Sequence, residues 1–502
     1  MKTRSLLQQL ASPGHIPAAL CLLVLTSAGC GDEGASARHA LTQEARSAQG
    51  SGPTDLWSEV APLSAPRTLH TMTLLQDGTP FVVGGLRTDT FDWLDTTETF
   101  DPTTDTWTPR ASLPYPFSGH EAVLLTDGRV LVSGNVDDVA QIYDPAADAW
   151  SATTFMIFTG GTATLLEDGT VLVAGGFFDF DENLSFSVYD PQTNALLHTA
   201  PLPNGWNNAT ATRLADGRVL MAGGWRWDYS SMDGEQQVTL ADAALFDPVT
   251  RTWTATAPMH LARLGHSAVL LGDGRVLVTG GDFGTGTDSA ELYDPAAGTW
   301  TQTTPMHTAR ANHTITLLPS GRAVVAGGYN SQGVDSVEAY DASTDTWTEL
   351  SPLNVPRLNH RAVLVPGAGL LLAGGKSGGL FDDGLSSVEI HPFGQGILGS
   401  TCAIGDECES AFCHGDVCVD SLPGTGGAGG AGGGGGDEGV GGTGQGGAGG
   451  QPGNPTSGAG GSSNDDGGCQ LAAGAGTSAT GLSGWLAMAG MAWLASRRRR
   501  QR

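Results

Sequence analysis

Five histidines stand at one position of a segment that recurs along the chain: His70, His120, His266, His313 and His360. Imidazole is a common metal ligand, so a ring of histidines would suggest a metal site. Equivalent positions of a repeat that closes into a ring are, however, spaced around a wide axis, and the register of the repeat accounts for them. We therefore expect these histidines to be structural, and we expect no metal and no other cofactor.

Two further patterns imitate functional motifs. Residues 375–379 read GKSGG and match G-x-S-x-G, but that motif needs a helix after its strand, whereas a loop is expected here. Asp179, Asp181 and Asn183 resemble the start of a calcium loop, yet Leu184 replaces the glycine of such loops and no suitable glutamate follows. No catalytic acid and base can be nominated from spacing, and we expect the chain not to be an enzyme.

Internal repetition predicts the elements that position these residues. Seven segments align without a gap and begin at His70, His120, Gly161, Ala209, His266, His313 and His360. Each predicts two apolar strands around a tight turn, most often Asp-Gly, which favours a two-residue hairpin. A third strand with an aromatic-Asp-Pro corner and a fourth strand with Trp follow, as in LYDPAAGTW at 292–300. Four short strands per repeat of about 50 residues predict an all-β, seven-bladed β-propeller over residues 56–396.

The paired glycines, the aromatic-Asp-Pro corner and the fourth-strand Trp resemble kelch repeats from Leu56 to Phe393, with departures at Gly134-Asn135 and at Leu197, which stands where Trp is expected. The best-known enzyme on a seven-bladed kelch scaffold is galactose oxidase. That enzyme depends on copper and on a Tyr that is crosslinked to Cys. No Cys occurs between Gly31 and Thr401. We therefore expect no copper radical cofactor of that kind.

Closure of the ring can also be predicted. The seventh segment ends at SSVEIHPF without a Trp strand, while LWSEVAPL at 56–63, which contains Trp57, precedes the first segment. We expect this N-terminal strand to complete the last blade, because that arrangement removes two exposed sheet edges.

The loops after the paired glycines lie on one face of the predicted disc and differ sharply in length and composition. Because binding residues concentrate on loops held by a rigid scaffold, we expect ligand contacts there. Aromatic side chains with acids between them suit stacking on sugar rings or anchoring of a protein, although they equally suit packing of the loops themselves. The candidates are Trp225, Trp227, Asp228 and Tyr229 in the fourth segment, Phe91 and Trp93 in the first, and Phe178 in the third.

Arginines precede four of the recurring histidines by three residues: Arg67, Arg263, Arg310 and Arg357. Their repetition indicates first a structural, hydrogen-bonding role between blades. Because the inner strands begin on the variable face, Arg263, Arg310 and Arg357 are also candidates for ligand contacts at the rim of its central mouth.

The charge of the chain excludes one class of partner. Acidic residues number 52 against 24 basic ones, a net charge of −28, and such a field repels phosphate backbones. We expect no nucleic acid partner, a monomeric propeller, and a surface protein or polysaccharide as ligand.

Residues 1–30 have the layout of a secretory signal peptide, with Lys2 and Arg4 before a short apolar stretch. Their ending, LTSAGC, resembles the lipobox of bacterial lipoproteins, and the resemblance implies lipidation of Cys30. An incidental Cys near an ordinary cleavage site is the alternative. Residues 31–55 are expected to be a linker.

Three segments follow the propeller. In residues 397–420, the cysteines of an exported chain predict two disulfides of open connectivity, with a zinc site as the rival: Cys402, Cys408, Cys413 and Cys418. Residues 421–468 contain 24 Gly in 48 positions, which predicts a flexible linker. Residues 469–502 combine a Gly-Cys, an apolar segment and an Arg cluster, and resemble the MYXO-CTERM sorting signal of myxobacterial surface proteins, with Cys469 at the processing position. A plain C-terminal membrane helix is the alternative.

Both ends therefore predict an exported protein, tethered at its termini to the outer membrane or cell surface. Together with the variable loops, this predicts a surface-displayed binding or adhesion module that captures a protein or glycan. The alternative is an extracellular enzyme of unassigned class that acts on polysaccharide, and a purely architectural envelope component is a third possibility.

Overall fold

The computed structural model describes residues 56–133, 140–153, 159–178, 181–182, 185–228, 236–282, 284–378, 384–393, 413–414 and 417–418. In this part of the chain, no helix is long and apolar enough to cross a membrane. The predicted signal peptide with Cys30, the Gly-rich linker and the sorting signal with Cys469 lie outside the described residues and stay predictions.

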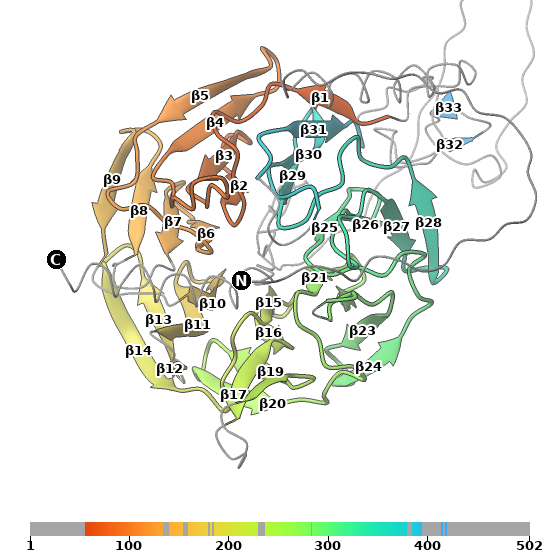
Figure 1. The fold of residues 1–502 in the computed structure, drawn as a ribbon. Coiled ribbons are helices and arrows are strands. Elements are labelled where there is room, and N and C mark those ends of the chain that lie inside the picture. The colour runs from red at the N-terminus through yellow and green to blue at the C-terminus, as the bar shows by residue number, and fades with distance from the viewer. Residues whose placement is uncertain are drawn as a thin grey trace, which may run out of the picture. The chain divides into compact units, whose positions relative to one another are not determined.

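Seven antiparallel sheets stand around a common axis, which confirms the predicted all-β, seven-bladed propeller (Figure 1). Blade 1 comprises β2 (Thr71–Leu74), β3 (Pro80–Val83), β4 (Thr97–Asp101) and β5 (Thr106–Arg110). Blade 2 comprises β6 (Glu121–Leu124), β7 (Val130–Ser133), β8 (Gln141–Asp144) and β9 (Ala149–Ala152). Blade 3 comprises β10 (Thr159–Leu165), β11 (Val171–Phe178), β13 (Ser185–Asp190) and β14 (Ala195–Pro201), with the short β12 (Asp181–Glu182) paired to β11.

The fourth blade carries an insertion, and the last three are regular. Blade 4 comprises β15 (Thr210–Arg213), β16 (Val219–Ala222), β19 (Ala243–Asp247) and β20 (Thr252–Ala255), with the hairpin β17 (Trp225–Asp228) and β18 (Gln236–Thr239) inserted. Blade 5 comprises β21 (Ser267–Leu270), β22 (Val276–Thr279), β23 (Ala290–Asp294) and β24 (Thr299–Gln302). Blade 6 comprises β25 (Thr314–Leu317), β26 (Ala323–Ala326), β27 (Val337–Asp341) and β28 (Thr346–Leu350). Blade 7 comprises β29 (Arg361–Val365), β30 (Gly369–Ala373), β31 (Val388–His391) and the N-terminal β1 (Ser58–Val60).

The ring closes as the sequence predicted, because β1 pairs with β31 and becomes the outer strand of blade 7. Trp57 secures this junction: its Nε1 donates to the carbonyl oxygen of Ser351 at 3.0 Å, and its own carbonyl accepts from Asn354 Nδ2 at 2.9 Å. Trp57 is also buried against Phe393, so the two ends of the propeller meet in one apolar cluster.

The turns between the first two strands differ from the predicted two-residue hairpin. In blade 1, Gly78 N donates to Leu75 O at 2.9 Å, and Leu75 N donates to Thr79 O at 2.9 Å. Only Gly78 has a positive φ, of 84°, whereas a type I′ hairpin needs two such residues. The turn is therefore of type I followed by a left-handed glycine, and Asp77 stabilises it by accepting from Thr79 N at 3.0 Å.

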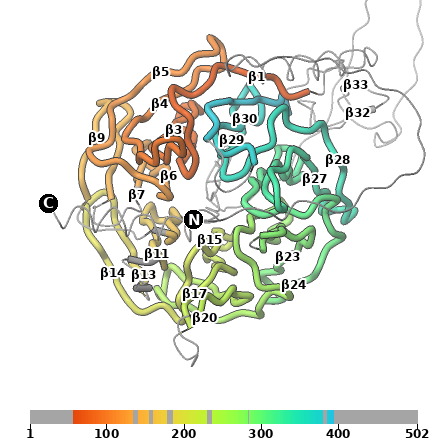
Figure 2. Tube along the Cα trace, viewed as in Figure 1, coloured from red at the N-terminus to blue at the C-terminus, as the bar shows by residue number. Residues whose placement is uncertain are grey.

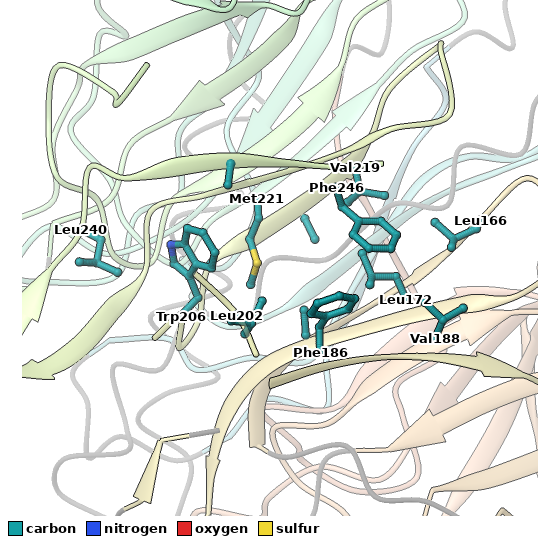
Figure 3. Close-up of a cluster of buried hydrophobic side chains, with 14 residues drawn as sticks. Leu166, Leu172, Phe186, Val188, Leu202, Trp206, Val219, Met221, Leu240 and Phe246 are labelled. Carbon is teal, nitrogen blue, oxygen red and sulfur yellow. The ribbon is translucent and has the colours of Figure 1, made fainter. Parts of the chain in front are cut away.

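The core lies between blades rather than within one layer. Each apolar cluster joins facing strands of two neighbouring blades; one contains Leu172 and Phe186 of blade 3 together with Met221 and Phe246 of blade 4 (Figure 3). Truncating a fully buried residue of this kind, such as Phe246, costs about 3–5 kcal/mol in a typical core. The blades therefore stabilise one another, and a rigid ring results.

The fourth-strand tryptophans add a directional contact to this packing. Trp150 Nε1 donates to Ala111 O in the preceding blade at 2.7 Å, and Trp300 and Trp347 make the same contact with Ala257 and Thr304 at 2.8 and 3.0 Å. This recurrence explains why the sequence repeats Trp at that position.

Within residues 397–420, the structure describes only a small hairpin of β32 (Cys413–His414) and β33 (Val417–Cys418), in which Cys413 stands opposite Cys418. The side chains of this segment are outside the described part, so the predicted disulfides stay predictions.

Candidate functional site

Successive connections of a four-stranded meander alternate between the two faces of the disc, so the loops after the second strands lie opposite the tight first turns. On the face of the tight turns, a cavity of about 400 Å³ lies between blades 4 and 5. Its carboxylates are engaged locally: Asp216 with Arg218 at 2.6 Å, and Asp273 with Arg275 at 2.6 Å. The hydrogen bond from Arg218 holds the pKa of Asp216 below its ordinary value. These groups stabilise turns and leave the other face as the better candidate.

The largest feature of that other face is the hairpin of β17 and β18, inserted between β16 and β19 of blade 4 (Figure 1). Trp225 stands opposite Thr239, and Asp228 stands opposite Gln236. Regular pairing of this kind gives the loop a defined shape, as a recognition surface requires.

Trp225 anchors the hairpin to the ring. Its backbone exchanges two hydrogen bonds with Asn207, at 2.9 and 3.0 Å, and its side chain is only 7% exposed. Trp227 packs against it edge-on, with ring centroids 5.3 Å apart and planes at 85°. The structure therefore corrects the expectation that both tryptophans contact ligand: Trp225 is the support, and the half-buried Trp227 and Asp228 form the accessible surface. Tyr229 lies outside the described residues.

A polar brace that the sequence did not reveal holds the base of the hairpin. Arg226 Nη1 donates to Asn204 Oδ1 at 2.9 Å, and Asn204 Nδ2 donates to Asp242 Oδ2 at 2.7 Å. Asp242 occupies the position that Ser289 and Ser336 hold in blades 5 and 6, but its residue type does not recur there, so the repeat offered no signal for the brace.

The loop of blade 1 forms a second aromatic surface. Arg87 N donates to Asp92 O at 2.9 Å and closes the loop, and Arg87 pairs with Asp89 at 2.8 Å. At its tip, Phe91 is 53% exposed and has a φ of 56°, an unusual conformation for a bulky residue. Trp93 is half-buried and bridges back to Leu86.

The aromatic candidates do not form one site. Blades 1 and 4 stand on opposite sides of the ring, so Phe91 and Trp93 are separated from Trp227 (Figure 2). Phe178 ends β11, and its side chain is outside the described part of the chain. Two separate aromatic surfaces therefore replace the single surface that the sequence suggested.

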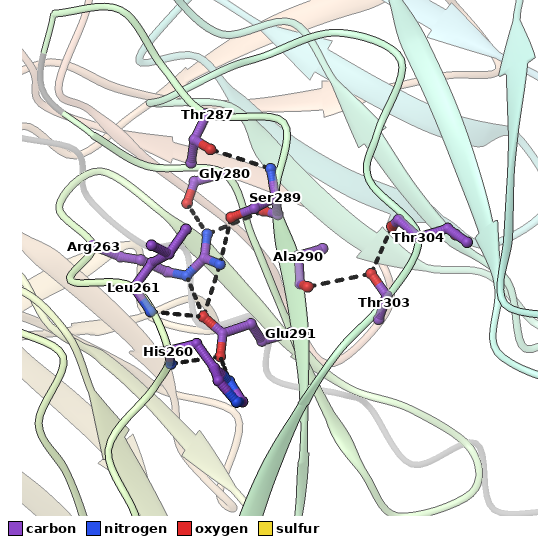
Figure 4. A network of polar contacts seen from close by, with 10 residues as sticks. All are labelled: His260, Leu261, Arg263, Gly280, Thr287, Ser289, Ala290, Glu291, Thr303 and Thr304. Atoms are coloured by element: carbon purple, nitrogen blue, oxygen red, sulfur yellow. Dashed lines mark hydrogen bonds and ion pairs between the residues drawn. The ribbon is translucent and has the colours of Figure 1, made fainter.

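The arginines are not at the rim of the mouth, which corrects their assignment as ligand contacts. Arg263, Arg310 and Arg357 are 0% exposed, as is Arg67. Arg263 Nη1 donates to Gly280 O at 2.6 Å, and Nη2 donates to Glu291 Oε1 at 2.9 Å and to Ser289 Oγ at 2.7 Å (Figure 4). Each of the four donates to a glycine carbonyl and to the glutamate of its own blade, so these buried guanidinium groups stabilise the blade.

The recurring histidines join neighbouring blades. The Nε2 of His120 forms a hydrogen bond with Thr71 Oγ1 at 2.9 Å, and His266 and His360 do the same with Thr210 and Thr314 at 3.1 and 3.0 Å. Burial lowers the pKa of His120 and His266 to about 3, so both imidazoles are neutral. Among the residues described, no group of three or more His, Cys, Asp and Glu is placed to hold a metal ion.

Comparison with known proteins agrees with the fold. The Kelch motif matches residues 263–307 and 320–354, in blades 5 and 6. No curated protein matches the chain in sequence. A solved structure described as a novel fungal alcohol oxidase of the AA5 family, in complex with copper, is similar with a TM-score of 0.53 and 17% identity, over 67% of this chain and 76% of that chain.

This similarity corrects one prediction from the sequence. Because no catalytic acid and base could be nominated, we expected the chain not to be an enzyme, and the similarity to an oxidase contradicts that expectation. At 17% identity the likeness shows the fold. The residues of this chain do not fit a copper radical centre: residues 31–401 lack Cys, and Tyr143 and Tyr340 are committed to Asp148 and Asp345 at 2.7 and 2.9 Å.

Proposed function

We propose that the propeller is a binding module that captures a glycan or protein ligand on its variable-loop face, through the β17–β18 hairpin. The observation that carries the proposal is the two-layer tryptophan arrangement, in which buried Trp225 holds the half-buried Trp227 beside Asp228. An aromatic ring on a fixed support offers contact area at small entropic cost.

The chemistry of this surface suits a sugar or a protein anchor. The ring of Trp227 offers an apolar face for C–H groups, and Asp228 accepts hydrogen bonds from hydroxyl or amide groups. The brace of Arg226, Asn204 and Asp242 supports preorganisation of the hairpin, because it ties the base of the hairpin to the segment that connects blade 3 to blade 4.

The test compares the purified full chain with Trp227→Ala, titrated against envelope polysaccharides and surface proteins. Val249→Ala is the matched control, because Val249 is highly exposed on a turn of the opposite face. We expect Trp227→Ala to weaken binding about tenfold or more, as truncation of a binding hot spot does. Circular dichroism reports whether each variant keeps its fold.

Binding that is equal in Trp227→Ala and wild type would refute the hairpin as the contact. The same experiment with Phe91→Ala then asks whether the surface of blade 1 binds instead. Loss in Val249→Ala alone would move recognition to the face of the tight turns.

Display at the cell surface is part of the proposal. The patterns at residues 1–30 and 469–502 support export and tethering by Cys30 or by the C-terminal segment. Protease treatment of intact cells, followed by detection of the propeller, measures this directly. A propeller protected until the cells are lysed would contradict surface display.

An extracellular enzyme that acts on polysaccharide is the second candidate function. The similarity to an alcohol oxidase favours it, because a related scaffold there carries catalysis. Incubation of the protein with the same polysaccharides, with assays for new reducing ends and for oxidised products, distinguishes turnover from capture. Product formation by the wild type would establish the enzyme; binding without product supports the module.

A further inference from the structure

Two residues, Glu121 and Arg361, break a pattern on the inner strands of the ring. The position after the recurring histidine lies on each inner strand and begins it in every blade but blade 3, and it carries a hydroxyl in five of the seven blades. In blade order it is occupied by Thr71, Glu121, Thr162, Thr210, Ser267, Thr314 and Arg361. Arg361 is thus a cation where most blades have a small side chain.

The exchange deprives a histidine of its partner. Thr71, Thr210 and Thr314 each form a hydrogen bond with the histidine of the next blade. Arg361 precedes His70 in the ring, and a guanidinium has no acceptor to offer. Of the five recurring histidines, all within the described residues, His70 is the one in which neither ring nitrogen has a hydrogen-bond partner, and it is 0% exposed.

The histidine ring cannot move away to find another partner. A Cβ built on Gly374 would lie 2.7 Å from His70 Cε1, so the backbone of blade 7 packs directly against the imidazole. The open nitrogens of His70 are therefore a fixed feature of the junction between blades 7 and 1.

Arg361 itself is buried without a hydrogen-bonded ion pair. It is 3% exposed, its Nε and Nη2 have no partner, and its Nη1 reaches only the carbonyl oxygen of the preceding residue, His360, at 3.4 Å. Four residues earlier, Arg357 is equally buried but pairs with Glu389. A buried cation without such an ion pair is costly, so its presence here points to a group that joins it.

The surroundings indicate the charge of that group. The inner strands β29, β2 and β6 lie side by side. Burial lowers the pKa of His70, and the charge of Arg361 lowers it further, so the imidazole is neutral. Glu121 on β6 partly offsets the effect of burial on the pKa of Arg361. One cation with one carboxylate in reach, in a chain of net charge −28, favours a monoanion over a phosphate or a polyanion.

We propose that Arg361 and His70 form a binding site for the carboxylate of a small organic acid or acidic sugar at the axis of the ring. The Nε and Nη2 groups form one edge of the guanidinium, and their parallel N–H bonds match the two oxygens of a carboxylate. His70 donates a third hydrogen bond from its neutral ring. This site is separate from the β17–β18 hairpin, and the proposal does not depend on ligand binding by the hairpin.

The test is a melting-temperature titration of the full chain with acetate and with glucuronate, at constant ionic strength. Glucose is the control for the sugar ring without a carboxylate. We expect a rise of about 2–5 °C at saturating glucuronate or acetate and none with glucose. Isothermal titration calorimetry gives the dissociation constants.

Arg361→Thr introduces the side chain that four other blades carry, so it is expected to fold and to give His70 a partner. It should lose at least about tenfold in carboxylate affinity. Arg361→Gln is a second neutral variant, and Arg129→Thr, on the face of the tight turns, controls for removal of one positive charge. A wild type that does not respond, an equal response to glucose, or a response kept in both Arg361 variants would each overturn the proposal.

Discussion

Blades 5, 6, 7 and 1 hold the segment entering the inner strand with a buried ion pair, whereas blades 2 and 4 have an aromatic residue and an uncharged residue at these two positions. The pairs are Arg263–Glu291, Arg310–Glu338, Arg357–Glu389 and Arg67–Glu98. At the arginine position, blade 2 has Phe117 and blade 4 has Trp206; at the glutamate position, they have Gln141 and Ala244. In these six blades, arginine and glutamate occur together or are both replaced.

The comparison shows which exchanges a repeat tolerates. Removing one member of a buried pair leaves an uncompensated charge, whereas replacing both with apolar groups of matching volume is often neutral. In blade 4, the small Ala244 accompanies the large Trp206, and both pack in one cluster with Met221 (Figure 3). The ring thus fills the same pair of buried positions in two ways, with an arginine–glutamate ion pair or with uncharged side chains.

Acid should produce the largest effect, and it should distinguish blades with a buried recurring histidine from blades without one. Buried histidines occupy blades 5, 6, 7, 1 and 2, whereas blades 3 and 4 have Gly161 and Ala209. Burial lowers the pKa of His120 and His266 to about 3, below the value of about 6.5 for an unfolded histidine. Between these values the unfolded chain binds more protons, so the free energy of unfolding falls as pH falls from about 6.5 towards 3.

Urea unfolding at a series of pH values measures this dependence, and hydrogen exchange shows which blades open first. We expect blades with histidine to lose protection before blades 3 and 4. His266→Ala, which copies the residue of blade 4, should reduce the slope of stability against pH. A free energy of unfolding that is constant from neutral pH to about pH 5 would contradict the assignment of neutral, buried imidazoles.

Removal of one carboxylate should have the next largest effect. Glu338→Ala leaves the fully buried Arg310 without its partner at 2.6 Å. We expect a loss of about 3–5 kcal/mol in the free energy of unfolding, measured by urea denaturation. A loss below about 1 kcal/mol would mean that solvent reaches the guanidinium.

The double variant Arg310→Trp with Glu338→Ala transfers the pair of blade 4 into blade 6. We expect it to be more stable than Glu338→Ala alone, with a residual loss of about 1–3 kcal/mol because the new site is not shaped for Trp. Urea denaturation of both variants measures the difference in their free energies of unfolding. A double variant less stable than the single one would show that the apolar solution depends on neighbours found only in blade 4.

Exposed ion pairs on the tight turns should have the smallest effect. Arg275 and Asp273 lie 2.6 Å apart, but both side chains are more than one-third exposed. We expect Arg275→Ala to cost less than about 1 kcal/mol, because water screens the pair. A cost as large as that of Glu338→Ala would remove the distinction between buried and exposed pairs.

Much of the fold could be predicted because it repeats. The recurrence of Asp-Gly, Gly-Gly and Trp predicted seven blades, and the unmatched Trp57 predicted the closing strand, which β1 confirms. The candidate site was predicted less well. Aromatic content identified the loop that carries Trp225 and Trp227, but local composition does not report burial, and the roles of the two residues differ.

The sequence by itself determined the repeat, its register and its closure, because these depend on local turn chemistry and on the alternation of apolar residues. The tertiary structure decided which side chains are buried and which of them meet. It placed Arg263 inside a blade, put Phe91 and Trp227 on opposite sides of the ring, and left His70 beside Arg361 without a partner. The junction of His70 with blade 7 joins the two ends of the propeller sequence, so it forms only once the ring has closed.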